Sequence, residues 1–180
     1  MPALGWVPLE GRGSLPFALV HGESLIAAAS WAVGEAGIQL YDATVTLADI
    51  RASGRMLVLH DPLCPLTPPE FLSEAVRRCA ETDQVVVGYR PVTDTVKPLL
   101  GDVLGQTVDR SALLAVATPV VIPARVLAEV PEADARDFAA LVERLAAYGP
   151  ICWIEAPALA RRVLDPAELG VLEALSRSSV

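Results

Sequence analysis

The sequence predicts an α/β fold in which a mostly parallel central sheet has helices on both faces. Short apolar runs alternate with segments of helical periodicity along the 180-residue chain. Several of these runs are apolar throughout, which is typical of strands buried on both faces. No internal repeat, low-complexity tract or long linker divides the sequence, so residues 1–180 are expected to form a single domain.

The elements of the first half follow from turn, cap and composition signals. Residues 5–9 are expected to form the first strand, and the alanine-rich residues 23–35 a helix. Residues 56–60 form a short apolar run that ends in polar residues, as a buried parallel strand does. The next helix is expected to have Thr67 as its cap and Pro68 in its first turn.

The second half contains a change of pattern. A valine-rich strand is expected at residues 84–89, followed by a hairpin-like excursion, or β-arm, at about residues 91–110, where Pro and Gly interrupt the chain. A strand at residues 151–154 and a last helix capped by Asp165 follow. Before this strand, a helix with one apolar face is expected, formed by Phe138, Leu141, Val142 and Leu145.

Composition and charge exclude several classes of function. The net charge of −8 argues against a nucleic-acid partner, because such binding relies on clustered Lys and Arg. The most apolar stretch, residues 24–33, is too short for a membrane span of ~20 residues. With no basic region before an apolar run at the N-terminus, a cytoplasmic protein without a membrane partner is expected. Free buried thiols are the preferred interpretation of the widely spaced Cys64, Cys79 and Cys152.

His60 and Asp61 come directly after an expected buried strand. Ligands of α/β sheets bind beyond the carboxyl ends of strands, so Asp61 is a candidate site residue. Asp61 can equally start a turn before Pro62, with its side chain on local backbone N–H groups. His60 is interpreted as structural, because no acid–base partner is evident.

The polar hairpin is a second candidate site. Thr95 and Arg110 lie on its two sides, and a guanidinium beside a hydroxyl suits a phosphate. The residues alone favour the plainer alternative, a solvated hairpin in which Asp94 and Lys97 neutralise each other.

Four ordered motifs change that balance. They are residues 57–61 (LVLHD), 91–97 (PVTDTVK), 107–113 (TVDRSAL) and 117–119 (ATP). In order and spacing they resemble the 2-C-methyl-D-erythritol 4-phosphate cytidylyltransferases of isoprenoid biosynthesis. The resemblance covers residues 55–130 well and continues more weakly toward the end of the chain.

The resemblance implies a Rossmann-like, three-layer αβα nucleotidyltransferase fold and a homodimer through the arm. In this family the phosphate of methylerythritol phosphate, a sugar-alcohol phosphate, attacks CTP with the help of Mg²⁺. Asp61 would lie near the nucleotide and the metal. Thr95 and Arg110 would hold the sugar-alcohol phosphate, in the partner's site where the arm crosses the dimer. Thr118 would be close by, and Arg162 takes the place of a lysine near that phosphate.

Other positions depart from the family pattern. Gly11 and Gly13 remain in the nucleotide loop, where their N–H groups can face a phosphate, but the loop is shortened and carries Glu10. Phe17 takes the place of a lysine, and Arg12 is the candidate substitute cation. A segment between Gly37 and Arg55, with a strand and part of the cytosine site, looks deleted, so a sheet with fewer strands is expected.

Two classes of function remain open. The first is a reduced cytidylyltransferase whose activity is weak or lost, since each missing donor to transition-state charge costs ~10²–10³ in rate. The second is a non-catalytic binding or regulatory protein, a pseudoenzyme that keeps the dimer arm.

Overall fold

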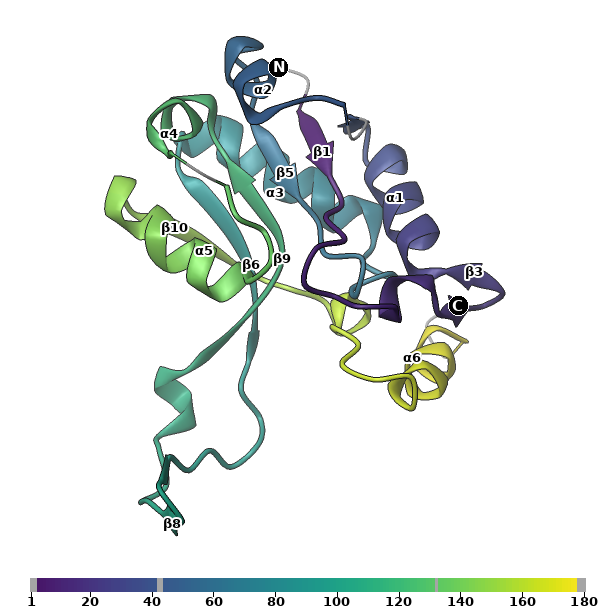
Figure 1. The fold of residues 1–180 in the computed structure, drawn as a ribbon, viewed down its shortest axis with the longest axis vertical. Coiled ribbons are helices and arrows are strands. Elements are labelled where there is room, and N and C mark those ends of the chain that lie inside the picture. The colour runs from purple at the N-terminus through teal and green to yellow at the C-terminus, as the bar shows by residue number, and fades with distance from the viewer. Residues whose placement is uncertain (1–2, 42–43, 132, 178–180) are drawn as a thin grey trace.

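The computed structural model describes residues 3–41, 44–131 and 133–177 and contains a six-stranded sheet in the order β10–β6–β9–β5–β1–β4 (Figure 1). All neighbouring strands are parallel except β9, which runs antiparallel to both β5 and β6. This confirms the predicted α/β fold with a mostly parallel sheet. The strands are β1 (Leu4–Trp6), β4 (Gln39–Leu40), β5 (Leu57–Leu59), β6 (Val85–Pro91), β9 (Leu114–Ile122) and β10 (Ile151–Glu155).

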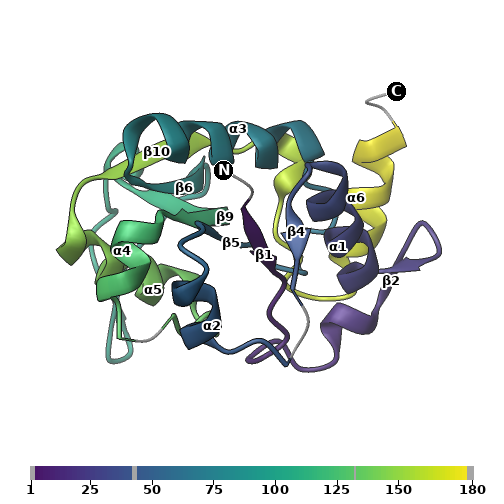
Figure 2. The same ribbon diagram turned by 90° about the horizontal axis from the view of Figure 1, so that it is seen from above.

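Helices cover both faces of the sheet, as Figure 2 shows. One face carries α1 (Leu25–Glu35) and α3 (Pro69–Thr82), and the other carries α2 (Leu47–Ala52), α4 (Ala124–Glu129) and α5 (Phe138–Leu145). Because side chains alternate along a strand, Val58 belongs to one core cluster while Leu57 and Leu59 belong to the other. The result is a three-layer αβα arrangement.

Smaller elements complete the fold. The last helix, α6 (Glu168–Arg177), contacts the two-stranded hairpin of β2 (Leu19–Val20) and β3 (Glu23–Ser24). Asp165 accepts hydrogen bonds from the N–H groups of Ala167 and Glu168, as its expected capping role requires. Single 3-10 turns lie at η1 (Leu15–Phe17), η2 (Arg110–Ala112), η3 (Ala146–Tyr148) and η4 (Ala158–Ala160).

Several predicted boundaries shift by a few residues. The predicted first strand ends early, since β1 covers Leu4–Trp6. Helix α1 begins at Leu25, and Ser24 caps it by accepting from the N–H of Ala27 at 3.3 Å. The capping role given to Thr67 is wrong: Pro68 is the cap of α3, and the Thr67 hydroxyl donates to the carbonyl of Cys64 at 2.8 Å.

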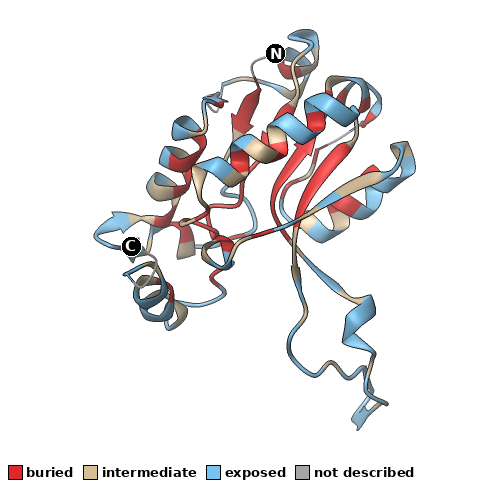
Figure 3. Cartoon of the chain, turned by 180° about the vertical axis from the view of Figure 1, so that it is seen from behind, coloured by how far each residue is buried: buried red, intermediate tan, exposed pale blue. Residues whose placement is uncertain are grey.

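Residues 92–113 form a hairpin that extends away from the sheet between β6 and β9 (Figure 1). Its end consists of β7 (Leu99–Leu100) and β8 (Val103–Leu104), and Val96 and Val108 form an antiparallel bridge nearer the sheet. Figure 3 colours most of this 92–113 hairpin as exposed. The side chains at its tip are therefore apolar but unburied: Leu99, Leu100 and Val103 are each 68% exposed and Leu104 is 66% exposed.

The described residues include no helix that is long and apolar enough to cross a membrane. All three cysteines are free thiols, with Cys64 and Cys79 buried and Cys152 partly buried. This fits the interpretation of the cysteines as core residues.

Candidate functional site

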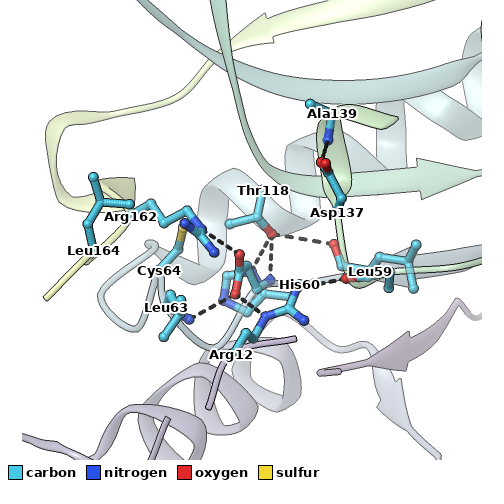
Figure 4. Close-up of polar contacts among 12 residues, drawn as sticks. Arg12, Leu59, His60, Leu63, Cys64, Thr118, Asp137, Ala139, Arg162 and Leu164 are labelled. Carbon is cyan, nitrogen blue, oxygen red and sulfur yellow. Dashed lines mark hydrogen bonds and ion pairs between the residues drawn. The ribbon is translucent and has the colours of Figure 1, made fainter. Parts of the chain in front are cut away.

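Asp61 lies at the carboxyl end of β5, between two arginines from distant parts of the chain (Figure 4). Arg12, in the loop after β1, places Nε 2.7 Å from Oδ1 of Asp61. Arg162, which follows η4, places its Nε 2.9 Å from Oδ2. We refer to these three residues as the arginine clasp. It brings together three of the side chains that the family resemblance places at the catalytic site.

Arg12 is held from several sides. Its Nη1 donates to the carbonyl of Glu10 at 2.6 Å, and its Nη2 donates to the carbonyl of Ala135 at 2.9 Å. The guanidinium also lies over the ring of Phe138, 5.3 Å from its centroid. The side chain is only 1% exposed. Arg12 is thus a structural cation whose nitrogens already donate to protein oxygens.

The carboxylate of Asp61 is ionised and well satisfied. Burial alone would raise its pKa, but the charges and hydrogen bonds of Arg12 and Arg162 outweigh burial and lower the pKa below its usual value. Oδ1 also accepts from the N–H of Leu63 at 3.1 Å, so Asp61 starts a turn as well as pairing with arginines. The turn interpretation of Asp61 is therefore confirmed, and its role as a ligand-binding residue stays a prediction.

Thr118 on β9 joins His60 and Asp61 in a buried network. Its Oγ1 accepts from the N–H of Asp61 at 3.1 Å and lies 2.8 Å from Nδ1 of His60. Burial lowers the pKa of His60 to about 4, so the ring is neutral near pH 7. Among the described residues, His60 Nε2 is the one buried side-chain nitrogen or oxygen without a hydrogen-bond partner. His60 therefore orients Thr118 and carries no charge, in agreement with its predicted structural role.

Two glycines allow the backbone around this site to pack closely. A Cβ on Gly88 of β6 would lie 2.7 Å from the carbonyl oxygen of Thr118, so only glycine fits there without a shift. Gly11 has a φ of +79°, and its Cβ would lie 3.3 Å from that of Arg136. The loop carrying Arg12 can thus approach residues 133–136. The contacts of Gly11 and Gly13 do not bear on their predicted phosphate-binding role, which stays a prediction.

A cavity of about 390 Å³ opens beside the arginine clasp. Arg162 is an accessible cation of this cavity, because its side chain is 42% exposed whereas that of Arg12 is buried. Arg136, which is 64% exposed and paired with Asp134, is a second one. Burial raises the pKa of the Cys64 thiol well above its usual value, so this lining residue is not a nucleophile. Thr118, Arg136 and Phe138 contribute further parts of the wall.

Sequence reasoning missed Arg136, Asp137 and Phe138 as lining residues. Their place is set by the start of α5, where Asp137 accepts from the N–H groups of Ala139 and Ala140. The amphipathic helix was recognisable from the sequence, but nothing in its pattern indicates that its first turn faces Asp61.

Thr95 and Arg110 lie apart from this cavity within one protomer. Both belong to the exposed 92–113 hairpin, where the guanidinium of Arg110 donates to the carbonyl of Thr93. Of the six predicted site side chains, Arg12, Asp61, Thr118 and Arg162 meet, and Thr95 and Arg110 do not join them.

The donor set does not fit a Mg²⁺ ion. Both oxygens of Asp61 are within 3 Å of an arginine nitrogen. In the described part of the chain, no group of three or more His, Cys, Asp or Glu side chains could hold a metal ion. Magnesium prefers several oxygen ligands and one or more free carboxylates.

Comparison with known proteins places the chain in a family. It is 34% identical over 126 residues to the 2-C-methyl-D-erythritol 4-phosphate cytidylyltransferase of Saccharopolyspora erythraea, covering 67% of this chain and 55% of that protein. The corresponding protein of Corynebacterium diphtheriae is 27% identical over 170 residues, which cover 90% of this chain and 64% of the relative. The chain thus spans less than two thirds of the length of these relatives.

Solved structures agree on the fold. The crystal structure of 2-C-methyl-D-erythritol 4-phosphate cytidylyltransferase from Thermus thermophilus matches with a TM-score of 0.70 at 20% identity, over 98% of both chains. A 4-diphosphocytidyl-2C-methyl-D-erythritol synthase matches with a TM-score of 0.73 at 15% identity, over 98% of this chain and 100% of the other. No protein-family model matches the chain. The sequence relatives and the shared fold together show that the chain is a divergent member of the 2-C-methyl-D-erythritol 4-phosphate cytidylyltransferase family.

Proposed function

We propose that this protein binds a sugar-alcohol phosphate beside Arg162 but transfers a cytidylyl group from CTP weakly or not at all. The observation that carries the proposal is the burial of Arg12 against Asp61. A cation that serves a nucleotide must present its donors to the incoming phosphates. Arg12 instead directs its donors to Asp61, Glu10 and Ala135.

The rest of the nucleotide half supports weak or lost transfer. Phe17, at the position where the family has a lysine, is 61% exposed and offers no charge. The carboxylate of Glu10 is exposed in the same loop and would repel a triphosphate. Because each missing donor costs ~10²–10³ in rate, two such losses leave little turnover.

The acceptor half is better preserved. Arg162 is partly exposed in the cavity, and its guanidinium offers forked donors that match a phosphate. One carboxylate between two guanidinium groups leaves the arginine clasp with a net positive charge. A phosphate monoester that reaches Arg162 would meet this excess charge without separating Arg12 from Asp61.

The proposed assembly is a homodimer in which the 92–113 hairpin crosses to the partner. Thr95 and Arg110 are exposed on that hairpin and lie outside the cavity of their own protomer. A two-fold dimer would carry them to the partner's cavity, where they could bind the same phosphate. A second candidate, a non-catalytic regulator that pairs with another family member, is favoured by the apolar tip of the same hairpin.

A binding and turnover experiment tests the proposal. Calorimetry should detect methylerythritol phosphate binding that Arg162→Ala weakens by about tenfold or more, the loss of one charge-assisted contact. Arg161→Ala is the matched control, because Arg161 is exposed and pairs with Glu168 at 3.2 Å. Pyrophosphate release from CTP and methylerythritol phosphate should stay at background. Mg²⁺-dependent release that Arg110→Ala abolishes would instead establish an active cytidylyltransferase.

A further inference from the structure

A second cavity, of about 430 Å³, lies along residues 133–136. Arg136 contributes to the lining of both cavities. The second cavity is otherwise lined mainly by apolar side chains, among them Trp6, Tyr41, Leu47 and Ile50. Its volume falls in the range of small-molecule sites, roughly 300–1,000 Å³. We call it the aromatic pocket.

Two rings form one wall of the aromatic pocket. Trp6 ends β1, and Tyr41 follows the neighbouring strand β4, where its N–H donates to the carbonyl of Gly5 at 3.2 Å. The ring centroids of Trp6 and Tyr41 are 6.1 Å apart and the planes are inclined by 39°. Both side chains are partly buried, so their rings are held in place yet remain accessible. Inclined aromatic faces of this kind attract cations through their electron-rich π systems.

The charged groups of the aromatic pocket favour the same class of ligand. Asp134 is paired with Arg136, whose Nη2 lies 2.7 Å from Oδ2, so these two charges offset each other. Glu10 remains, and the lining carries a net negative charge. The pKa of Tyr41 is raised above its usual value, first by burial of the side chain and second by the negative charge of Glu10. An anion would be repelled here, whereas a cation would gain from both the rings and the carboxylate.

We propose that the aromatic pocket binds a small organic cation, an amine or quaternary ammonium with apolar substituents. Its charged nitrogen lies against Trp6 and Tyr41 and faces Glu10, and its apolar part packs on Leu47 and Ile50. This binding needs neither CTP nor a sugar phosphate. It is therefore independent of the function proposed for the cavity beside Arg162.

Choline and its uncharged isostere 3,3-dimethylbutanol test the proposal, because they differ in charge but hardly in shape. We expect choline to bind about tenfold more tightly than the isostere, as a partly desolvated cation–π contact predicts. Glu10→Gln should weaken choline binding by a similar factor and leave the isostere unchanged. The control is Glu35→Gln, which removes one negative charge from an exposed position near the end of α1. Calorimetry on the full chain measures both ligands with the wild-type chain and with each of the two variants.

Two further measurements make the result decisive. Trp6→Leu should abolish the preference for choline, with circular dichroism showing that the fold is kept. Arg162→Ala should leave choline binding unchanged, so this proposal and the phosphate proposal can fail separately. Equal affinity for choline and the isostere, tighter binding of cytidine than of choline, or no saturable choline binding on the order of 10 mM would each overturn the inference.

Discussion

Asp61 lies between two arginines whose environments differ. Arg12 is buried with 1% of its side chain exposed, whereas 42% of Arg162 is exposed. A buried cation has lost its hydration and depends on its counter-ion, while an exposed one retains water. The main energetic role of Asp61 is therefore to neutralise Arg12.

Removing the charge of Asp61 should destabilise the fold. In Asp61→Asn the guanidinium of Arg12 stays buried without a counter-ion, and the free energy of unfolding should fall by about 3–5 kcal/mol. Urea denaturation measures the change. The control is Asp83→Asn, since the Asp83–Arg125 pair is largely exposed and should contribute little. If the free energy of unfolding fell by similar amounts in both variants, the buried arginine clasp would stabilise the fold no more than an exposed ion pair does.

His60 should make stability depend on pH. Its pKa is lowered to about 4 in the folded chain, from 6.5 in the unfolded one. Between these values the unfolded chain takes up a proton that the folded chain excludes, so the free energy of unfolding falls as the pH falls. The loss should approach ~3 kcal/mol by pH 4.

His60→Gln should reduce this pH dependence, because glutamine does not titrate. Urea midpoints at several values between pH 7 and pH 4.5 provide the measurement. His21→Gln, which removes the other histidine at an exposed position, should retain the slope of the wild-type chain. An unchanged slope in His60→Gln would assign the pH dependence to other groups.

At the scale of elements, the sequence predicts those with strong local signals. Helices α3 and α5 were recognisable because their apolar residues share one face, and Leu72, Ala75, Leu141 and Leu145 are indeed buried. Strands β5 and β6 were recognisable as short apolar runs. In each case the local pattern and the tertiary burial agree.

Other elements were missed because their signals are weak or contradictory. Pro119 lies within β9 (Leu114–Ile122), and proline argues against a central strand. The sheet tolerates it because the pairing of β6 with β9 shifts register between Val87 and Tyr89. Helix α2 and strand β4 are short, and both lie in the segment between Gly37 and Arg55 where a deletion was expected. The meeting of Arg12, Asp61 and Arg162 is a tertiary property that no local pattern encodes.

Gly88 should be intolerant of a side chain. The added Cβ would lie 2.7 Å from the backbone oxygen of Thr118, which cannot rotate away, so Gly88→Ala should cost about 1–3 kcal/mol as strands β6 and β9 move apart. Gly34→Ala is the matched control. Gly34 lies in α1 with open space around it, and alanine there should stabilise by up to about 1 kcal/mol. Thermal unfolding of both variants measures the difference, and equal effects would contradict the packing argument.

At the scale of the whole molecule, the burial of apolar groups is uneven. Two core clusters lie on opposite faces of one sheet and take up most of the buried side chains. The 92–113 hairpin stands apart from them and exposes Leu99, Leu100, Val103 and Leu104. Contiguous exposed apolar groups are typical of surfaces that pair with another protein.

The proposed homodimer should therefore depend on the hairpin tip. Leu99→Ser combined with Leu100→Ser should convert the dimer to a monomer in sedimentation experiments. The fold should not change, because both side chains are 68% exposed in the protomer. Leu164→Ser combined with Val171→Ser replaces two other exposed apolar side chains and should leave the dimer intact. A wild-type chain that sediments as a monomer would contradict the proposed assembly.

The network of His60, Thr118 and Asp61 has a consequence for how such a chain evolves. Replacing any one of the three leaves a buried polar group without its partner, which costs stability whether or not the protein turns over a substrate. Selection for folding alone would therefore retain these residues after catalysis has been lost. Their persistence in a descendant records its ancestry and the demands of its core. Evidence of present activity has to come from groups that folding does not require, such as the exposed side of Arg162.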